Sequence, residues 1–223
     1  MAGKDQVQLL SLRELSLRQP VEVPCLPLGM SEIDRLIDGF PRGAISEIVG
    51  EPGSGGTSLL MRLFAAATAR MEICAYLDAT GTFDPSSAAA TGVLLSQVVW
   101  VRCEGNVDAA LRSADHLLQA GGFGVIAIDL GGISHRILRR IPSSFWYRYR
   151  RVIEHTSTIL VILGREIVTR SCASLQLQFR QKKALWIDRN GGSGLFRGQN
   201  FELVRVKPMR PGSVSLIASP RLS

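Results

Sequence analysis

The fold is decided by the stretch "VGEPGSGGTSLL", residues 49–60, which follows an apolar run and precedes a segment rich in Leu and Ala. Its spacing fits the phosphate-binding pattern G-x-x-x-x-G-K-[ST], except that position 56 holds glycine instead of lysine. In such a loop between a strand and a helix, backbone N–H groups converge on an anion at the positive end of the helix. The residues expected to form this site are Gly50, Gly53, Ser54, Gly55, Gly56, Thr57 and Ser58.

A second apolar run, "GVIAIDL" at residues 124–130, ends with an acid, Asp129. A working nucleotide site needs such an acid to orient Mg²⁺ or its water shell, and Thr57 is the hydroxyl that would meet the ion. The missing lysine removes a full positive charge from the phosphates, and Glu51 is the only ionisable side chain in the loop. We therefore expect a phosphate-binding fold whose turnover is reduced by orders of magnitude.

Strand-like and helix-like segments alternate along most of the chain, which predicts an α/β fold with a mainly parallel central sheet and helices on both faces. A short helix with Ser31 and Asp34 as a near capping box is expected first. After residue 170 the pattern changes to shorter segments that predict antiparallel edge strands. The predicted strands are 44–50, 73–79, 97–103, 123–130 and 157–166, and the predicted helices are 31–39, 57–71, 86–93, 107–121 and 144–156.

Composition limits the domain organisation and the compartment. A helix at 6–18 and a proline-punctuated segment at 20–29 predict an N-terminal helix with linker over 1–25, followed by a single core domain over 26–223. No run of about 18 uncharged apolar residues predicts a membrane span, and the N-terminus lacks the layout of a signal peptide. The four separated cysteines favour buried thiols in a reducing cytoplasm over a metal site or disulfides.

The net charge of +7 is unevenly distributed: residues 1–135 carry 9 basic and 15 acidic side chains, and residues 136–223 carry 17 basic and 4 acidic ones. A C-terminal part this basic predicts binding to a polyanion such as DNA, with a solvated surface or a protein-binding face as alternatives. Aromatic residues at 145, 146, 147 and 149 lie among the arginines, a pattern typical of single-strand binding. The proposed DNA contacts are Arg136, Arg139, Arg140, Arg148, Arg150, Arg151, Arg180, Lys182 and Lys183, which Arg205, Lys207 and Arg210 could extend.

Three segments together resemble the core of the RecA recombinase family: residues 26–59, "CAYLDATGTFDPSSAAATGVLLSQVVWVRC" and "GVIAIDL". The resemblance covers about residues 26–130 in order and with similar spacing. Within that family, residues 143–177 look most like the short ImuA-type proteins, which are encoded with error-prone polymerases in bacterial mutagenesis cassettes. This resemblance implies a RecA-like P-loop fold and a part in the SOS response to DNA damage.

Departures from the family pattern imply that hydrolysis is not the function. Where the family has a catalytic glutamate two residues after the acid of the second strand, this chain has Thr80. The polar sensor falls at Gly164 and Arg165, and the two DNA-gripping loops are shortened. Weak ATP and Mg²⁺ binding without turnover stays open, no cofactor is required, and no metal site is predicted.

The expected function is that of a catalytically degenerate RecA-like accessory protein in bacterial DNA repair and translesion synthesis. The expected partners are DNA, most plausibly single-stranded, and an error-prone polymerase or RecA-like protein; the N-terminal helix offers a route to self-association. Two alternatives remain: a DNA-dependent ATPase or recombinase with a non-standard P-loop, and an inhibitor of a RecA or cell-division partner.

Overall fold

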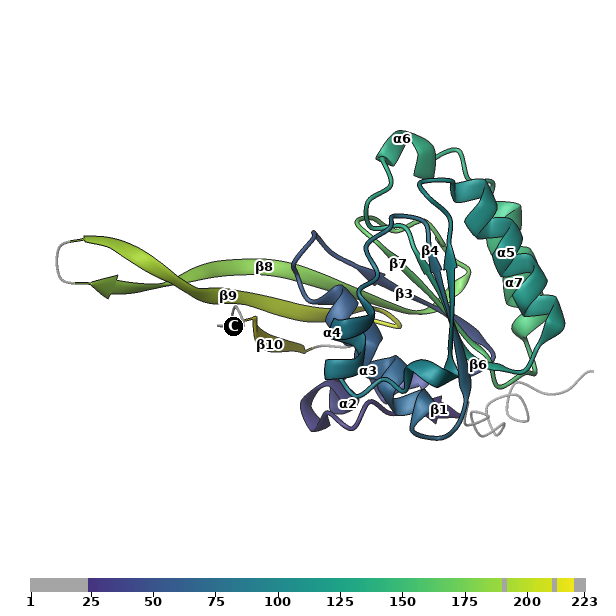
Figure 1. The fold of residues 1–223 in the computed structure, drawn as a ribbon, viewed down its shortest axis with the longest axis horizontal. Coiled ribbons are helices and arrows are strands. Elements are labelled where there is room, and N and C mark those ends of the chain that lie inside the picture. Colours follow the sequence, from purple (N-terminus) through teal and green to yellow (C-terminus); the bar gives the residue numbers. More distant parts are fainter. Residues whose placement is uncertain (1–23, 190–191, 210–211, 219–223) are drawn as a thin grey trace, which may run out of the picture.

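The computed structural model describes residues 24–189, 192–209 and 212–218, with side chains described over 24–182, 200–209 and 212–216. Eight strands form one twisted sheet in the order β10-β9-β8-β3-β7-β6-β4-β5 (Figure 1). The pairs from β8 through β3, β7, β6 and β4 to β5 are all parallel, and β9 and β10 are antiparallel. The sequence prediction of a mainly parallel sheet with antiparallel edge strands is confirmed. The strands are β3 (Ala44–Val49), β4 (Ile73–Asp78), β5 (Val98–Arg102), β6 (Phe123–Asp129), β7 (Ile159–Gly164), β8 (Ala173–Arg189), β9 (Gly192–Lys207) and β10 (Ser213–Ala218).

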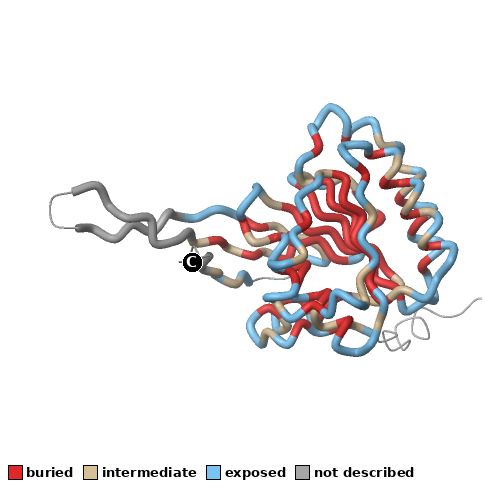
Figure 2. Tube along the Cα trace, in the orientation of Figure 1, coloured by how far each residue is buried: buried red, intermediate tan, exposed pale blue. Residues whose placement is uncertain are grey.

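Helices cover both faces of the sheet because the buried parallel strands present apolar side chains to both sides, as Figure 2 shows for the core. One apolar core joins the sheet to α2 (Ser31–Ile37), α3 (Gly56–Thr68) and α4 (Pro85–Ala90). The other joins it to α5 (Val107–Ala120), α6 (His135–Leu138) and α7 (Ser143–Ile153). The remaining elements are the small β1 (Cys25–Leu26) and β2 (Phe40–Pro41) pair and the single turn η1 (Leu95–Gln97).

Helix starts follow from local capping. The Asp84 carboxylate accepts hydrogen bonds from the backbone N–H groups of Ser86 and Ser87 at the start of α4, and Asn106 caps α5. The expected capping role of Ser31 is wrong: Met30 is the N-cap of α2 and makes no side-chain cap. Asp34 instead reaches back and accepts from the N–H groups of Leu28 (2.8 Å) and Met30 (3.0 Å), because two donors there lack a backbone partner.

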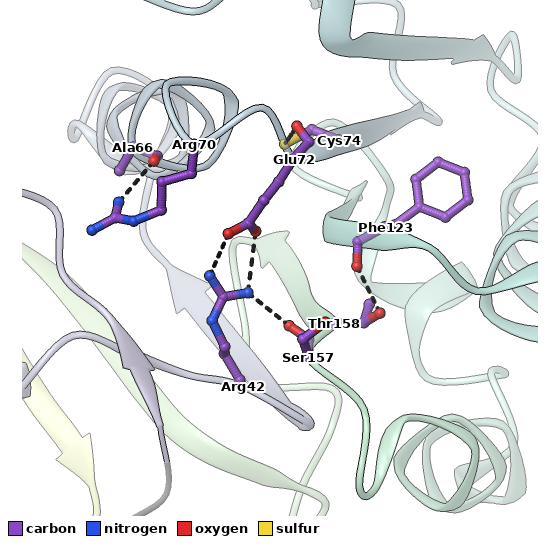
Figure 3. Close-up of polar contacts among 8 residues, drawn as sticks. All are labelled: Arg42, Ala66, Arg70, Glu72, Cys74, Phe123, Ser157 and Thr158. Carbon is purple, nitrogen blue, oxygen red and sulfur yellow. Dashed lines mark hydrogen bonds and ion pairs between the residues drawn. The ribbon is translucent and has the colours of Figure 1, made fainter.

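An ion pair ties together the edge of the sheet at which the parallel strands begin (Figure 3). The Arg42 guanidinium, just before β3, donates to both carboxylate oxygens of Glu72 (2.6 and 3.1 Å) and to the carbonyl of Ser157. A bidentate contact of this kind fixes geometry more firmly than a single ion pair. It lies at the opposite end of the strands from the phosphate-binding loop, so its role is structural.

The expectation of short C-terminal strands is wrong. β8 and β9 span 17 and 16 residues, whereas the strands from β3 to β7 span 5 to 7 residues each. Their pairing continues beyond the body of the domain as a projecting two-stranded ribbon (Figure 1). A β-ladder is held by backbone hydrogen bonds, so it continues where the side-chain pattern no longer indicates a strand.

Candidate phosphate-binding site and basic surface

The predicted loop lies between β3 and α3, as expected. Its glycines adopt the conformations that the turn needs, with φ of +78° at Gly53 and +104° at Gly55. The N–H of Gly50 donates to the carbonyl of Gly164 (3.0 Å), which joins the loop to the end of β7. A Cβ at position 50 would meet Phe179 Cβ at 2.9 Å, so β8 packs directly under the loop.

Position 56 is the first residue of α3, and Gly56 is buried. A Cβ there would come within 3.0 Å of the Leu163 Cδ1 atom and 3.4 Å of the Ile48 Cγ2 atom. The place from which a lysine would extend is therefore crowded by apolar side chains. The glycine fits its surroundings in addition to lacking a charge.

Asp129 lies at the end of β6, level with Asp78 on β4 and Leu163 on β7. It is 3% exposed, and its carboxylate already accepts hydrogen bonds from the Tyr76 hydroxyl (2.6 Å), the Thr82 hydroxyl (3.1 Å) and the Gly131 N–H (2.8 Å). Burial together with the Asp129 charge raises the pKa of Tyr76 far above its usual range, so the phenol stays a donor. With the Thr80 hydroxyl at 3.4 Å, four protein donors thus compete with any ion for this carboxylate.

Thr80 stands where the resemblance predicts a catalytic glutamate. Its hydroxyl lies 2.7 Å from the Thr82 hydroxyl, 3.3 Å from Asp78 and 3.4 Å from Asp129. A threonine hydroxyl is no general base at neutral pH, so this network can position groups but not remove a proton from water.

Asp78 organises the segment that follows β4. Its buried carboxylate accepts from the backbone N–H groups of residues 80–83 and from the indole N–H of Trp100 (3.2 Å). Burial alone would raise the pKa of Asp78, but these hydrogen bonds, that from Phe83 foremost, bring it below its ordinary value. The carboxylate is a structural acceptor, and Asp78 does not itself line the cavity over the loop.

A cavity of about 420 Å³ opens over the loop, which is room for a phosphate group and more. Among its lining residues the charged side chains are Glu51, Asp129 and Arg165, so Arg165 is the cation of this site. The side chain is exposed and follows β7 directly. Within the described part of the chain, no cluster of three or more His, Cys, Asp or Glu side chains is arranged to hold a metal ion.

The segment between β7 and β8 is held by a buried carboxylate that the sequence reading missed. Glu47, on β3, accepts from the N–H groups of Val168 (2.7 Å) and Thr169 (3.2 Å) and from the side chains of Thr169 and Gln176. Burial is the main influence on Glu47 and raises its pKa, while these hydrogen bonds act in the opposite direction. Three of these hydrogen bonds come from Val168 and Thr169, and together they fix this segment against β3.

Comparisons with known proteins agree on one family. The sequence profile of the RecA N-terminal domain matches residues 4–133, more than half of the chain. The chain belongs to the RecA family. It is 33% identical over 121 residues to Protein RecA of Rickettsia massiliae (strain Mtu5), a match that covers 53% of this chain and 35% of the relative. Protein RecA of Borreliella afzelii (strain PKo) is 37% identical over 93 residues, covering 42% and 25% of the two chains. The matches span about a third or less of these relatives, and they do not distinguish the ImuA type.

The predicted DNA contacts of this RecA-family chain divide among three places (Figure 1). Arg136, Arg139 and Arg140 are exposed on and just after α6, and Arg140 lines a cavity of about 520 Å³ beside the start of α5. The α7 arginines form a second group. Arg180 and Lys182 lie on the β8–β9 ribbon, where Lys182 pairs with Glu202 (2.9 Å), and the side chain of Lys183 lies outside the described residues.

The α7 arginines are not equivalent. Arg148 pairs with Asp115 on α5 through two hydrogen bonds (2.5 and 3.0 Å), and its guanidinium lies 4.6 Å from the Phe145 ring centre. Arg150 and Arg151 are exposed, and within the described ranges neither has an ion pair. Free cations are available for phosphates, whereas Arg148 already has a carboxylate partner.

The aromatic residues of α7 separate in the same way. Trp146 and Tyr149 are 1% and 0% exposed and, with Ile153, form the face that packs on the sheet. Tyr147 is 54% exposed and points the other way. In the sequence all four aromatic residues of α7 lie beside arginines. In the structure only Tyr147 among them is in the exposed class.

None of the described helices is long and apolar enough to cross a bilayer. The expected N-terminal helix at 6–18 lies outside the described residues, and the boundary between 1–25 and 26–223 stays a prediction.

Proposed function

We propose that this chain is a RecA-family accessory protein of bacterial DNA repair that binds single-stranded DNA and protein partners without turning over ATP. The observation that carries the proposal is the state of the nucleotide site. Its loop lies between β3 and α3 over a cavity, yet position 56 holds glycine in apolar contact with Leu163 and Thr80 offers no general base. Losing a preorganised charge and a base removes several orders of magnitude of rate.

The DNA part of the proposal rests on free cations. Arg136, Arg140, Arg150 and Arg151 are exposed and carry no ion pair within the described residues, and Arg139 only approaches His135 (3.5 Å). Such a surface binds phosphates without reading bases, and its affinity falls with salt as counterions are released. A role in SOS-induced translesion synthesis follows from the ImuA-like resemblance of residues 143–177 and is part of this proposal. A cytoplasmic location, proposed from the four separated cysteines, is part of it as well.

The protein-partner part is supported by β5. This strand lies at the edge of the sheet, and Val99 (41%) and Trp100 (38%) on it are exposed, as are Leu94 (45%) and Leu95 (40%) just before it. An apolar edge strand is a template for pairing with another chain. An error-prone polymerase, a RecA-like protein and a second copy acting through the N-terminal helix are the candidate partners.

Two measurements test the function. Phosphate release from ATP should stay below about 1 per minute with and without single-stranded DNA, far below ordinary enzyme rates. Single-strand binding should weaken steeply as salt rises toward about 0.5 M. Faster release, or binding that is indifferent to salt, would contradict the proposal.

A second candidate, a DNA-dependent ATPase with a non-standard cation, is favoured by one observation. Arg165 lines the cavity and is the cation there. If Arg165 replaces the lysine, the wild type should hydrolyse ATP faster in the presence of DNA. Arg165→Gln should then abolish this DNA-stimulated hydrolysis.

A further inference from the structure

Tyr147 and Arg150 on α7 lie beside Ser171, before β8, and Lys207, at the end of β9. We call this surface the seam, and it combines an anchored aromatic ring with several cations. The Tyr147 hydroxyl lies 3.0 Å from the Ser171 hydroxyl, and the Lys207 ammonium donates to the Ser171 carbonyl (2.9 Å). Ser171 therefore joins α7, the segment before β8 and the end of β9 at one point. The ring of Tyr147 stays 54% exposed despite this anchor.

The cations around Tyr147 are placed by helix geometry and by the sheet. Arg150 and Arg151 follow it by three and four residues, so they lie one turn away on the same side of α7. Burial raises the pKa of the neighbouring Cys172 thiol, and the charges of Arg150 and Lys207 act in the opposite direction, so both lie near it. No ion pair neutralises Arg150, Arg151 or Lys207 within the described part of the chain.

The seam is also preorganised. Ser171 lies two residues after Thr169, which with Val168 donates its backbone N–H group to the buried Glu47. The Cys172 N–H donates to the Thr169 carbonyl (3.0 Å). An exposed ring on such a support loses little conformational freedom when a flat ligand stacks on it.

We propose that Tyr147 is a base-stacking residue, flanked by Arg150 and Lys207 as phosphate contacts, which makes this seam selective for unpaired nucleotides. This inference rests on the proposed binding of single-stranded DNA and adds the residue that recognises the unpaired bases. A duplex hides its base faces in the stack, so only unpaired bases can lie on the ring.

The test uses the full chain and three fluorescein-labelled probes: an oligothymidylate of about 20 nucleotides, the same strand with abasic central positions, and a duplex of equal length. Tyr147→Ala should weaken oligothymidylate binding about 5- to 100-fold, the range known for one stacked base. It should leave abasic-strand and duplex binding within about twofold of the wild type, and Tyr147→Phe should keep most of the affinity.

The salt dependence distinguishes stacking from charge. Tyr147→Ala should leave the slope of log affinity against log salt unchanged, whereas Arg150→Gln should reduce it by about 0.7, the value for one phosphate contact on a single strand. Val152→Ala, at an exposed position of the same helix, is the matched control and should change neither.

The outcomes separate this inference from the proposed function. If the wild type binds none of the probes, both are overturned. If it binds oligothymidylate but Tyr147→Ala binds equally well, or loses affinity for the abasic strand to the same extent, only the stacking role is overturned. Thermal unfolding of each variant, and Tyr147→Leu as a second truncation, guard against loss of the fold.

Discussion

The Leu163 side chain crowds the space that any side chain at position 56 would enter, with its Cδ1 atom 3.0 Å from the place of a Cβ on Gly56. The two residues belong to neighbouring elements, α3 and β7, and meet under the loop. The missing lysine is therefore a packing feature of the site as well as a missing charge.

Restoring the lysine alone should not restore a nucleotide site. Gly56→Lys overpacks the core against Leu163 and should cost about 1–3 kcal/mol of the free energy of unfolding. Gly56→Lys combined with Leu163→Ala has room for the side chain and should bind a fluorescent ATP analogue more tightly than either single variant. Neither should release phosphate, because Thr80 carries no carboxylate. Equal affinity of the single and double lysine variants would show that Leu163 is no obstacle.

Asp78 should make stability depend on pH. Its pKa in the folded state lies below that of an unfolded chain, about 3.9, so its contribution is present above that pH and is lost as the pH falls through the folded-state value. Asp78→Asn should lower the free energy of unfolding at pH 7 by about 1–3 kcal/mol. Denaturant titrations from pH 7 to pH 2.5 should show the two proteins converging in acid, and a constant gap would contradict the assignment.

Arg148 and Arg150 should behave differently although they are two residues apart. Arg148→Gln removes the pair with Asp115 and should change stability by about 0–1 kcal/mol while leaving DNA affinity within twofold. Arg150→Gln should leave stability unchanged and weaken DNA binding, most strongly at low salt. The comparison is matched because both substitutions remove one charge from the same helix. Equal losses of DNA affinity would place Arg148 in the interface as well.

Glu47 should be essential for the fold of the segment before β8. Glu47→Ala leaves the buried N–H groups of Val168 and Thr169 without an acceptor, which should cost about 3 kcal/mol or more. Glu47→Gln keeps an acceptor and should cost less. Thermal unfolding ranks the variants, and limited proteolysis between residues 165 and 172 should increase for the alanine variant first. Full resistance there would mean that Glu47 does not hold the segment.

Much of the fold could be predicted from local sequence. Apolar runs and helical periodicity placed the strands from β3 to β7 and the helices α3, α4, α5 and α7 within a few residues, because strands buried on both faces have to be apolar throughout. The four-residue helix α6 was not predicted. The loop was found because glycine is needed where φ is positive. The long β8–β9 ribbon was not foreseen, since backbone pairing outside the core leaves no hydrophobic pattern to read.

The site was predicted less completely because its parts come from distant segments. The sequence showed which residues are missing at 56 and 80, but Leu163, Tyr76 and Glu47 carry no motif. Arginine and aromatic residues on α7 looked interchangeable until burial separated Trp146 and Tyr149 from Tyr147.

The sequence by itself determined the family, the strand–loop–helix order and the loss of lysine and glutamate, because these depend on residue types at fixed local spacing. Only the tertiary structure decided that Leu163 crowds position 56, that Asp129 is already bound by Tyr76 and Thr82, and which cations are free. Those facts depend on side chains brought together by the parallel sheet, whose strand ends align residues far apart in the chain.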